Sequence, residues 1–248
     1  MQINLARNDD GAPEIFRSIQ GEGPMAGRER TFIRLSGCNL HCRWCDTAYT
    51  WNWEGSPFAH ESGKKYRPAE EMEKLSVAEA AAAVLALPAE GVVITGGEPM
   101  VQRAALRDLI QKLRAGAPGL RIEMETNGAL APSAELAALV DLFVVSPKLA
   151  HSGNDAALAL NAEALAAFAA LDQAHFKFVC QTPADADAAA AIAAQHNIAP
   201  ARVSLMPEGV SSETIRARLP ALADAARAHG FSVSDRLHIH QFGQKRGI

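Results

Sequence analysis

Short apolar runs alternate with longer alanine-rich segments along most of the chain. The runs are bounded by Gly, Pro and polar residues, which is typical of buried strands. The longer segments combine good helix formers with interspersed charges, and several begin with Ser or Pro, which is typical of packed helices. The predicted strands are Thr31–Leu35, Val92–Thr95, Arg121–Glu125, Leu142–Ser146, His175–Val179, Arg202–Met206 and Arg236–His240. The predicted helices are Ser76–Leu87, Val101–Ala115, Pro132–Val140, Ala162–Leu171, Pro183–Gln195 and Ser211–His229.

This alternation predicts an α/β fold in which parallel strands are joined by crossover helices. We expect a partial (β/α) barrel with the helices on its outside. The 248 residues suit one large domain, and no linker divides them, so we expect a single domain over residues 1–248. Residues 49–75 differ, because Gly, Ser, Pro, Lys and Glu crowd together there. We interpret them as a long excursion that lies over the functional site or over a partner surface.

Charge and hydropathy narrow the possible partners. The net charge is −4, and no basic run suits a phosphate backbone, so we expect no direct binding of nucleic acid. No apolar stretch approaches the ~20 residues that span a bilayer, and the chain starts without a secretory segment. We therefore expect a cytoplasmic protein, whose thiols stay reduced.

Three of the four cysteines lie within the string CNLHCRWCDT, as Cys38, Cys42 and Cys45. Three thiolates at C-x3-C-x2-C spacing can hold three irons of a 4Fe-4S cluster and leave the fourth iron open to a small molecule. A structural zinc site normally has four ligands, and His41 would complete one only in a strained loop. Disulfides are the remaining alternative. The fourth cysteine, Cys180, lies far downstream, so the open iron–sulfur cluster is the favoured interpretation.

The same loop carries a family resemblance. The spacing C-x3-C-x2-C resembles the signature of the radical S-adenosylmethionine (SAM) superfamily. The longer string CRWCDT, with SIQGEGPMAGR upstream and VVITGGEP downstream, resembles the 7-carboxy-7-deazaguanine synthases of queuosine biosynthesis. The similarity runs from Glu14 to the string RLHIHQFG near the end of the chain.

That family implies an activity and a set of cofactors. The expected reaction converts 6-carboxy-5,6,7,8-tetrahydropterin to 7-carboxy-7-deazaguanine with release of ammonia. The expected cofactors are a 4Fe-4S cluster, SAM bound at the open iron, and Mg²⁺. A flavodoxin-like electron donor and a homodimer are further implications of the resemblance.

Several polar or glycine-rich segments follow directly after predicted strands, where a parallel barrel gathers its loops around one opening. Gly96 and Gly97 let the backbone approach a ligand closely, or they form a tight turn. Lys148 suits a carboxylate or ribose oxygen, or it is simply solvated. By resemblance the SAM-binding residues are Trp44, Asp46, Gly96, Gly97, Glu98, Thr126, Ser146, Pro147, Lys148, Met206 and Pro207, with Met206 standing where the family often has glutamine.

The string QGEG offers amide, backbone and carboxylate partners for the donor and acceptor edge of a pterin, or else it forms a turn. The guanidinium of Arg34 can grip a carboxylate in bidentate fashion, or pair with a structural acid. By resemblance the substrate-binding residues are Ile19, Gln20, Gly21, Glu22, Arg34, Thr95 and His238.

Thr47 and the end of the chain complete the predicted site. A hydroxyl at Thr47 suits Mg²⁺, which prefers oxygen ligands, although a helix cap is the commoner role. The resemblance assigns Thr47 to magnesium. The final predicted strand would place His238 and His240 on one face.

Two other functions share parts of this pattern. A radical-generating activase of a partner protein would use the cysteines and GGEP, but it has no use for QGEG, Arg34 and Thr47 together. A non-catalytic electron-transfer module would need a fourth cysteine near the other three, and none is present.

Overall fold

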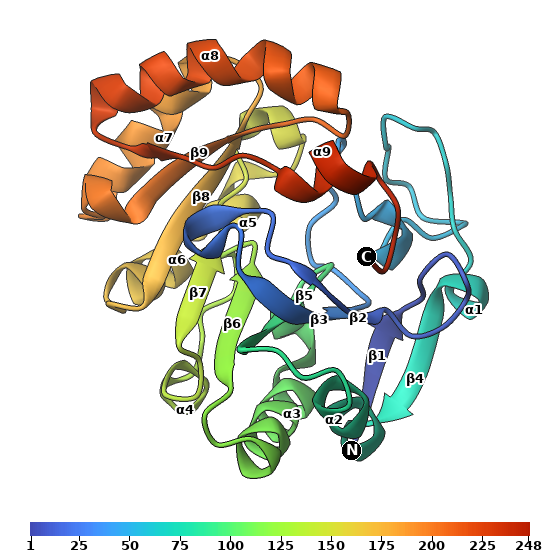
Figure 1. Cartoon of the computed structure of the whole chain (residues 1–248). Helices are drawn as coiled ribbons and strands as arrows, with labels where there is room; N and C mark the ends of the chain where they lie inside the picture. The colour runs from blue at the N-terminus through green and yellow to red at the C-terminus, as the bar shows by residue number, and fades with distance from the viewer.

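The predicted alternation of strands and helices is confirmed along most of the chain in the computed structural model, which describes all 248 residues. Ten strands form one sheet in the order β10-β9-β8-β7-β6-β5-β3-β1-β4, and β2 pairs with β3. The neighbours from β3 to β10 are parallel, and the curved sheet stays open as a partial barrel (Figure 1). The parallel strands are β3 (Glu29–Leu35), β5 (Gly91–Gly96), β6 (Arg121–Thr126), β7 (Leu142–Val145), β8 (Ala174–Cys180), β9 (Val203–Pro207) and β10 (Ser232–Val233).

An antiparallel extension at one end of the sheet was not predicted. It consists of β1 (Gln2–Ala6), β2 (Ile15–Ile19) and β4 (Met72–Ser76). The strand β4 lies mostly within the predicted excursion 49–75, so that prediction was wrong for its last residues. The reason is that all five residues of the string MEKLS pair with β1, although the string lacks the regular alternation of polarity that would mark it as a strand.

The helices cover the outer surface of the sheet, as α2, α3, α7 and α8 illustrate in Figure 1. The first of them begins with a capping box, in which Ser76 and Glu79 satisfy each other's backbone N–H groups. The six helices that match predictions are α2 (Val77–Leu85), α3 (Arg103–Gly116), α4 (Ala134–Ala137), α6 (Ala162–Ala169), α7 (Ala184–Gln195) and α8 (Ser212–His229). The short elements are α1 (Pro68–Glu71), α5 (Ala156–Ala159), η1 (Gly23–Met25), η2 (Ala48–Thr50), η3 (Pro99–Gln102), η4 (Ala150–Ser152) and η5 (Pro200–Arg202).

The final predicted strand was wrong, because residues 237–242 form a helix, α9 (Leu237–Phe242). The sheet already ends at β10, and the Leu237 N–H donates to the carbonyl oxygen of Gly21 at 3.0 Å, which turns the chain inward. Side chains two positions apart do not share a face of a helix. His238 therefore faces the interior, whereas His240 bonds to Ser212.

The central parallel strands have one face toward the helices and one toward the barrel interior. In β8, Phe176 and Phe178 belong to the main hydrophobic core, while Lys177 and Val179 line the interior. Burial of the apolar faces against the helices holds the barrel together. The inner faces are thereby free to carry polar side chains, so the functional site lies inside. No helix is both long and apolar enough to cross a membrane.

Candidate functional site

A cavity of about 390 Å³ opens where the parallel strands end, at the edge of the sheet where barrel folds gather functional loops. Its size suits a small-molecule ligand. Three of the predicted site residues, Glu98, Pro147 and Pro207, do not line it. The predicted residues that do line it are Ile19, Gln20, Gly21, Glu22, Arg34, Cys38, Cys42, Trp44, Cys45, Asp46, Thr47, Thr95, Gly96, Gly97, Thr126, Ser146, Lys148, Met206 and His238.

The three loop cysteines have the surroundings that an iron–sulfur cluster requires. All are free thiols on the cavity wall, and burial raises the pKa of each, so their thiolates need a cationic partner such as iron. Each sulfur also accepts an N–H hydrogen bond. The donors are the Leu40 backbone to Cys38 at 3.4 Å, the Asn154 amide to Cys42 at 3.2 Å and the Trp51 indole to Cys45 at 3.3 Å.

Such donors orient and tune cluster ligands. No group of three or more His, Cys, Asp or Glu side chains converges to hold a single metal ion. A 4Fe-4S cluster does not require that convergence, because each thiolate binds a different iron. The residues present therefore fit the cluster.

Gly96 and Gly97 place the end of β5 directly against the start of the cysteine loop. A Cβ atom on Gly96 would lie 2.2 Å from the Leu35 carbonyl oxygen, and one on Gly97 would lie 2.3 Å from that of Gly37. Gly96 also has φ +156°. The glycines are thus required by contact between two backbones, whereas the sequence had suggested either close approach to a ligand or a tight turn.

Glu98 is fully buried behind the cavity wall. Its carboxylate accepts hydrogen bonds from the Thr126 hydroxyl at 2.9 Å and from the backbone N–H groups of Asn127 and Met100 at 2.6 and 2.9 Å. Burial raises the pKa of Glu98 despite these bonds. Glu98 therefore holds the end of β6, and with it Thr126, in place.

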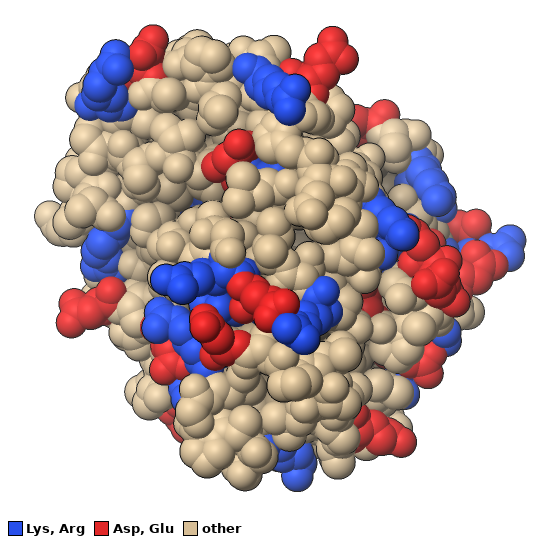
Figure 2. All heavy atoms as spheres, viewed as in Figure 1, with Lys and Arg blue, Asp and Glu red and all other residues tan.

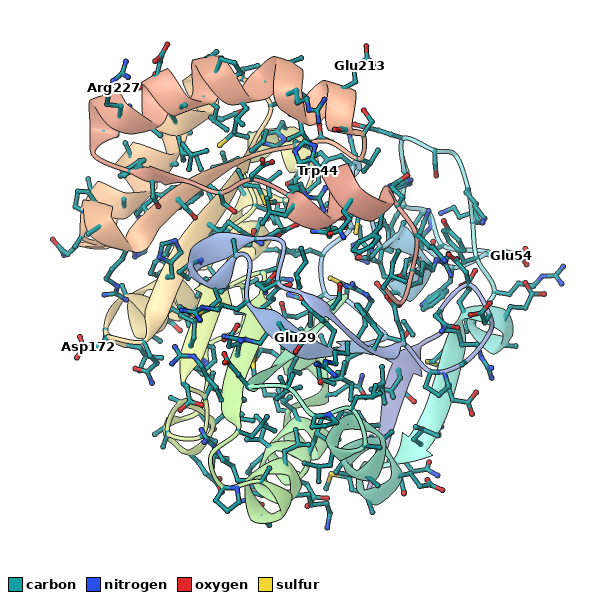
Figure 3. All side chains as sticks on the ribbon, viewed as in Figure 1. Glu29, Trp44, Glu54, Asp172, Glu213 and Arg227 are labelled. Carbon is teal, nitrogen blue, oxygen red and sulfur yellow. The ribbon has the colours of Figure 1, made fainter.

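On the side of the predicted SAM pocket, the Lys148 ammonium donates to the Ser146 hydroxyl at 2.7 Å and lies 6.0 Å from the Trp44 ring centre. Trp44 lies within the fold, in contrast to the side chains that project from α8 (Figure 3). Its indole N–H is buried without an acceptor in the protein. The tilted His151 ring, 5.5 Å away, supports Trp44 from behind.

Two cations that sequence reasoning missed hold Glu22. Lys177 pairs with one carboxylate oxygen, and Arg236 pairs with the other at 2.8 Å. Arg236 also pairs with Asp46 in the cysteine loop. Burial opposes the charge on Glu22, yet Lys177 and Arg236 hold its pKa well below the usual range. The sequence signal for Lys177 was a lysine within the apolar string AHFKFVC.

Arg34 is tied to an acid and is also open to the cavity. Its Nε donates to Glu14 at 2.8 Å, and the Tyr49 hydroxyl donates to the other oxygen of Glu14 at 2.8 Å. Although burial disfavours the charge, Glu14 and Tyr49 raise the pKa of Arg34. Its two terminal nitrogens have no partner in the protein, so both roles considered for Arg34 remain compatible with its position.

Glu125, at the end of β6, connects two predicted substrate residues. Its carboxylate accepts from the Gln20 amide at 3.2 Å and from the Thr95 hydroxyl at 2.9 Å. His238 lies 3.7 Å from Glu22, and burial lowers the pKa of His238 although Glu22 raises it. A Cβ on Gly21 would lie 2.1 Å from the His238 ring, which explains that glycine.

Thr47 precedes η2 in the capping position, but its side chain makes no capping hydrogen bond. Its hydroxyl lies on the cavity wall, 3.5 Å from the Cys45 sulfur. The helix-cap role is therefore not filled by this side chain. The hydroxyl is available to a ligand in the cavity.

The chain resembles proteins of known name along almost its whole length. The model of the radical SAM superfamily matches residues 32–150. A 7-carboxy-7-deazaguanine synthase of Pyrobaculum aerophilum is 37% identical over 236 residues, which cover 94% of this chain and 95% of the relative. The enzyme of the same name from Rhodopirellula baltica is 34% identical over 247 residues, with 94% and 87% covered. The crystal structure of QueE from Escherichia coli has a TM-score of 0.65 and 26% identity, and 95% of each chain is covered.

Proposed function

Because this chain belongs to the 7-carboxy-7-deazaguanine synthases of the radical SAM superfamily, we propose that it converts 6-carboxy-5,6,7,8-tetrahydropterin to 7-carboxy-7-deazaguanine with release of ammonia. The observation that carries the substrate assignment is the cavity wall. One cavity combines the three-cysteine loop with acidic, basic and amide groups suited to a flat polar ring. An electron-transfer module would have no use for such a wall.

The cluster would be held by Cys38, Cys42 and Cys45, and SAM would lie between the cysteine loop and the ends of β5, β6, β7 and β9. When bound, these groups supply the radical chemistry that removes a hydrogen atom from the substrate. The protein orients the reactants and excludes water. Within that pocket Lys148 offers a positive charge beside the ring of Trp44.

The substrate would be recognised by charge at one end and by hydrogen bonds along its ring. The two unpaired nitrogens of Arg34 suit the 6-carboxylate. Gln20, Glu22 and Glu125 supply donors and acceptors for the pterin edge. The hydrogen bond between Gln20 and Glu125 and the ion pairs of Glu22 with Lys177 and Arg236 preorganise them. Thr95 and His238, together with Ile19 and Gly21, would complete this wall.

The charge on Arg34 is tested by comparing two enzymes and two pterins. Removing one partner of a buried charge pair typically costs ~2–5 kcal/mol of binding free energy, so Arg34→Ala should strongly weaken the binding of the carboxylated substrate. The same variant should hardly change the affinity for a tetrahydropterin without the carboxylate. Calorimetry gives the affinities, and chromatography follows the product. Equal losses of affinity for both pterins would mean that Arg34 only pairs with Glu14 and supports the fold. The variant Arg34→Lys, which keeps the positive charge, is the control.

Magnesium would bind at Thr47, because its hydroxyl lies on the cavity wall with only the Cys45 sulfur, 3.5 Å away, as a partner, and it suits a hard cation that keeps several waters. There Mg²⁺ would neutralise the substrate carboxylate. Thr47→Ala should keep the cluster and SAM cleavage but lose the stimulation by magnesium. Activity is measured against magnesium concentration in both proteins. An unchanged response would remove Thr47 from the metal site.

SAM binding at the open iron separates this function from electron transfer. The reduced cluster should change its electron paramagnetic resonance spectrum when SAM is added anaerobically. An unchanged spectrum would leave the electron carrier as the better assignment.

The partners and location follow from the same chemistry. A flavodoxin-like protein would supply the electron, and turnover with purified flavodoxin and its reductase tests this. A homodimer is expected, and a monomer in light scattering would contradict it. The need for reduced thiols supports a cytoplasmic location, which cell fractionation checks.

A further inference from the structure

The last residues of the chain form part of the cavity wall. Gly243 through Ile248 follow α9, and all six of them line the cavity. We call them the tail segment. In Figure 1 the tail segment runs from α9 past the loops that follow the cysteines, and the chain ends beside them. Part of the substrate pocket is therefore built from a segment with no secondary structure of its own.

One arginine anchors the tail segment to three other parts of the molecule. The Arg246 guanidinium pairs with Glu71 at 2.6 Å, at the end of α1, and lies 3.6 Å from Asp9. Its backbone N–H donates to Asp9 at 3.1 Å. Its guanidinium carbon also lies 3.5 Å from the ring centre of Tyr49, which is cation–π distance. We call these four residues the clasp.

The clasp is more than a surface ion pair. The Arg246 side chain is 17% exposed and that of Glu71 is 16% exposed, so the pair is shielded from much of the solvent. Gly247, the next residue, has φ +76°, and a Cβ there would lie 3.0 Å from the Cβ of Asn8. Close packing thus fixes the tail segment at the residue that follows Arg246.

Tyr49 connects the clasp to Arg34, the residue predicted to bind the substrate carboxylate. Its ring carries Arg246 on one face, and its hydroxyl donates to Glu14 at 2.8 Å. Glu14 in turn accepts from Arg34 at 2.8 Å. An unbroken series of contacts therefore joins the tail segment to Arg34. The clasp closes one wall of the pocket and constrains the cation inside it.

We propose that Arg246 is a positioning residue for substrate binding: it holds the tail segment as a pocket wall and, through Tyr49 and Glu14, orients Arg34. The substrate named in this inference rests on the proposed function, whereas the contacts that hold the tail segment do not. Arg246 acts on the binding of the pterin and not on cluster assembly or SAM cleavage. Its loss therefore raises KM and leaves kcat nearly unchanged.

Two variants separate the role of the tail segment as a pocket wall from the relay, by which we mean the contacts from Arg246 through Tyr49 and Glu14 to Arg34. Arg246→Ala removes the clasp, so the tail segment exchanges its amide hydrogens faster and KM for the carboxylated pterin rises roughly tenfold. Tyr49→Phe keeps the ring under Arg246 but removes the hydroxyl, so KM rises while exchange in the tail segment stays as in the wild type. Arg246→Lys keeps the charge and restores part of the loss. The control is Arg227→Ala, whose exposed partner Asp224 lies on α8 far from the cavity.

The double variant Arg246→Ala with Tyr49→Phe tests the relay, because residues in one network give non-additive effects. The fold-increase in its KM should be well below the product of the fold-increases in the two single variants. Unchanged hydrogen exchange in Arg246→Ala would overturn the clasp, and additive effects would overturn the relay. A loss of kcat at unchanged KM would overturn the positioning role. Exchange is measured on the protein with its cluster, and it reports on the clasp even where the wild type fails to convert the pterin.

Discussion

At the scale of single residues, Cys42 and Cys180 show how position decides the role of a thiol. Both are buried, and burial raises the pKa of Cys42 and raises that of Cys180 to about 12. Cys42 lies on the cavity wall with an N–H donor at its sulfur, whereas Cys180 packs into the hydrophobic core at the end of β8. Only the first is placed to bind iron.

We therefore expect Cys42→Ala to lose the cluster and all turnover while the barrel stays folded, because the loop contributes ligands and little core. Iron and sulfide analysis after anaerobic reconstitution, with circular dichroism for the fold, measures this. Cys180→Ala is the matched control and should keep a full cluster. A complete, active cluster in Cys42→Ala would contradict the ligand assignment.

At the scale of elements, β8 combines a stabilising face and a functional face. Phe176 and Phe178 pack against the helices, while His175 and Lys177 point the other way. Burial, reinforced by the charges of Lys177 and Arg202, lowers the pKa of His175 to about 4. Protonation of His175 therefore lowers the stability of the folded chain, and this links the fold to pH.

Because the pKa of His175 is lower in the folded chain than in the unfolded chain, the unfolded state binds more protons between about pH 6.5 and 4. The free energy of unfolding should therefore fall as the pH drops through this window, by up to about 3 kcal/mol from this group. Denaturant unfolding at several pH values measures it. His175→Gln should flatten the slope. An equal slope in His175→Gln would contradict the prediction.

At the scale of the whole molecule, the two ends of the sheet have different tasks. The carboxyl ends of the strands carry the cavity, and the opposite end carries a buried ion pair between Arg30 on β3 and Glu123 on β6 at 2.8 Å. The pair passes over Gly91, where a Cβ would lie 3.1 Å from the Arg30 Nε. The outer surface, by contrast, intersperses acidic and basic side chains (Figure 2). Stability and function are therefore separable by mutation.

Glu123→Ala should lower the free energy of unfolding by ~3–5 kcal/mol, because it leaves the charge of Arg30 buried without its partner. The folded protein should keep its cluster and its activity per cluster. Denaturant titration and single-enzyme kinetics measure the two effects. Glu29→Ala, which removes an exposed partner of Arg17, should cost less than about 1 kcal/mol. A similarly small cost for Glu123→Ala would show that solvent or Glu90 replaces the lost carboxylate.

The order of strands and helices and the cysteine loop were determined by the sequence itself, because hydrophobic period and ligand spacing are local properties. The strings QGEG and GGEP likewise indicated where the cavity wall would form. The local pattern predicted the wrong element where the same string could form either a strand or a helix. The alternation of RLHIH suits a strand, but this string pairs with no strand of the sheet, and the Leu237 N–H bonds to Gly21 at the start of α9.

Only the tertiary structure decided which charges meet. Lys177, Arg236 and Glu22 come from three distant parts of the chain, and no local spacing links them. The same holds for Arg246, which reaches Asp9 across the whole length of the sequence. Ion pairs between distant residues depend on how the sheet curves and on where its loops converge. Those are properties of the folded barrel, so the sequence supplied the ligands and the fold arranged their partners.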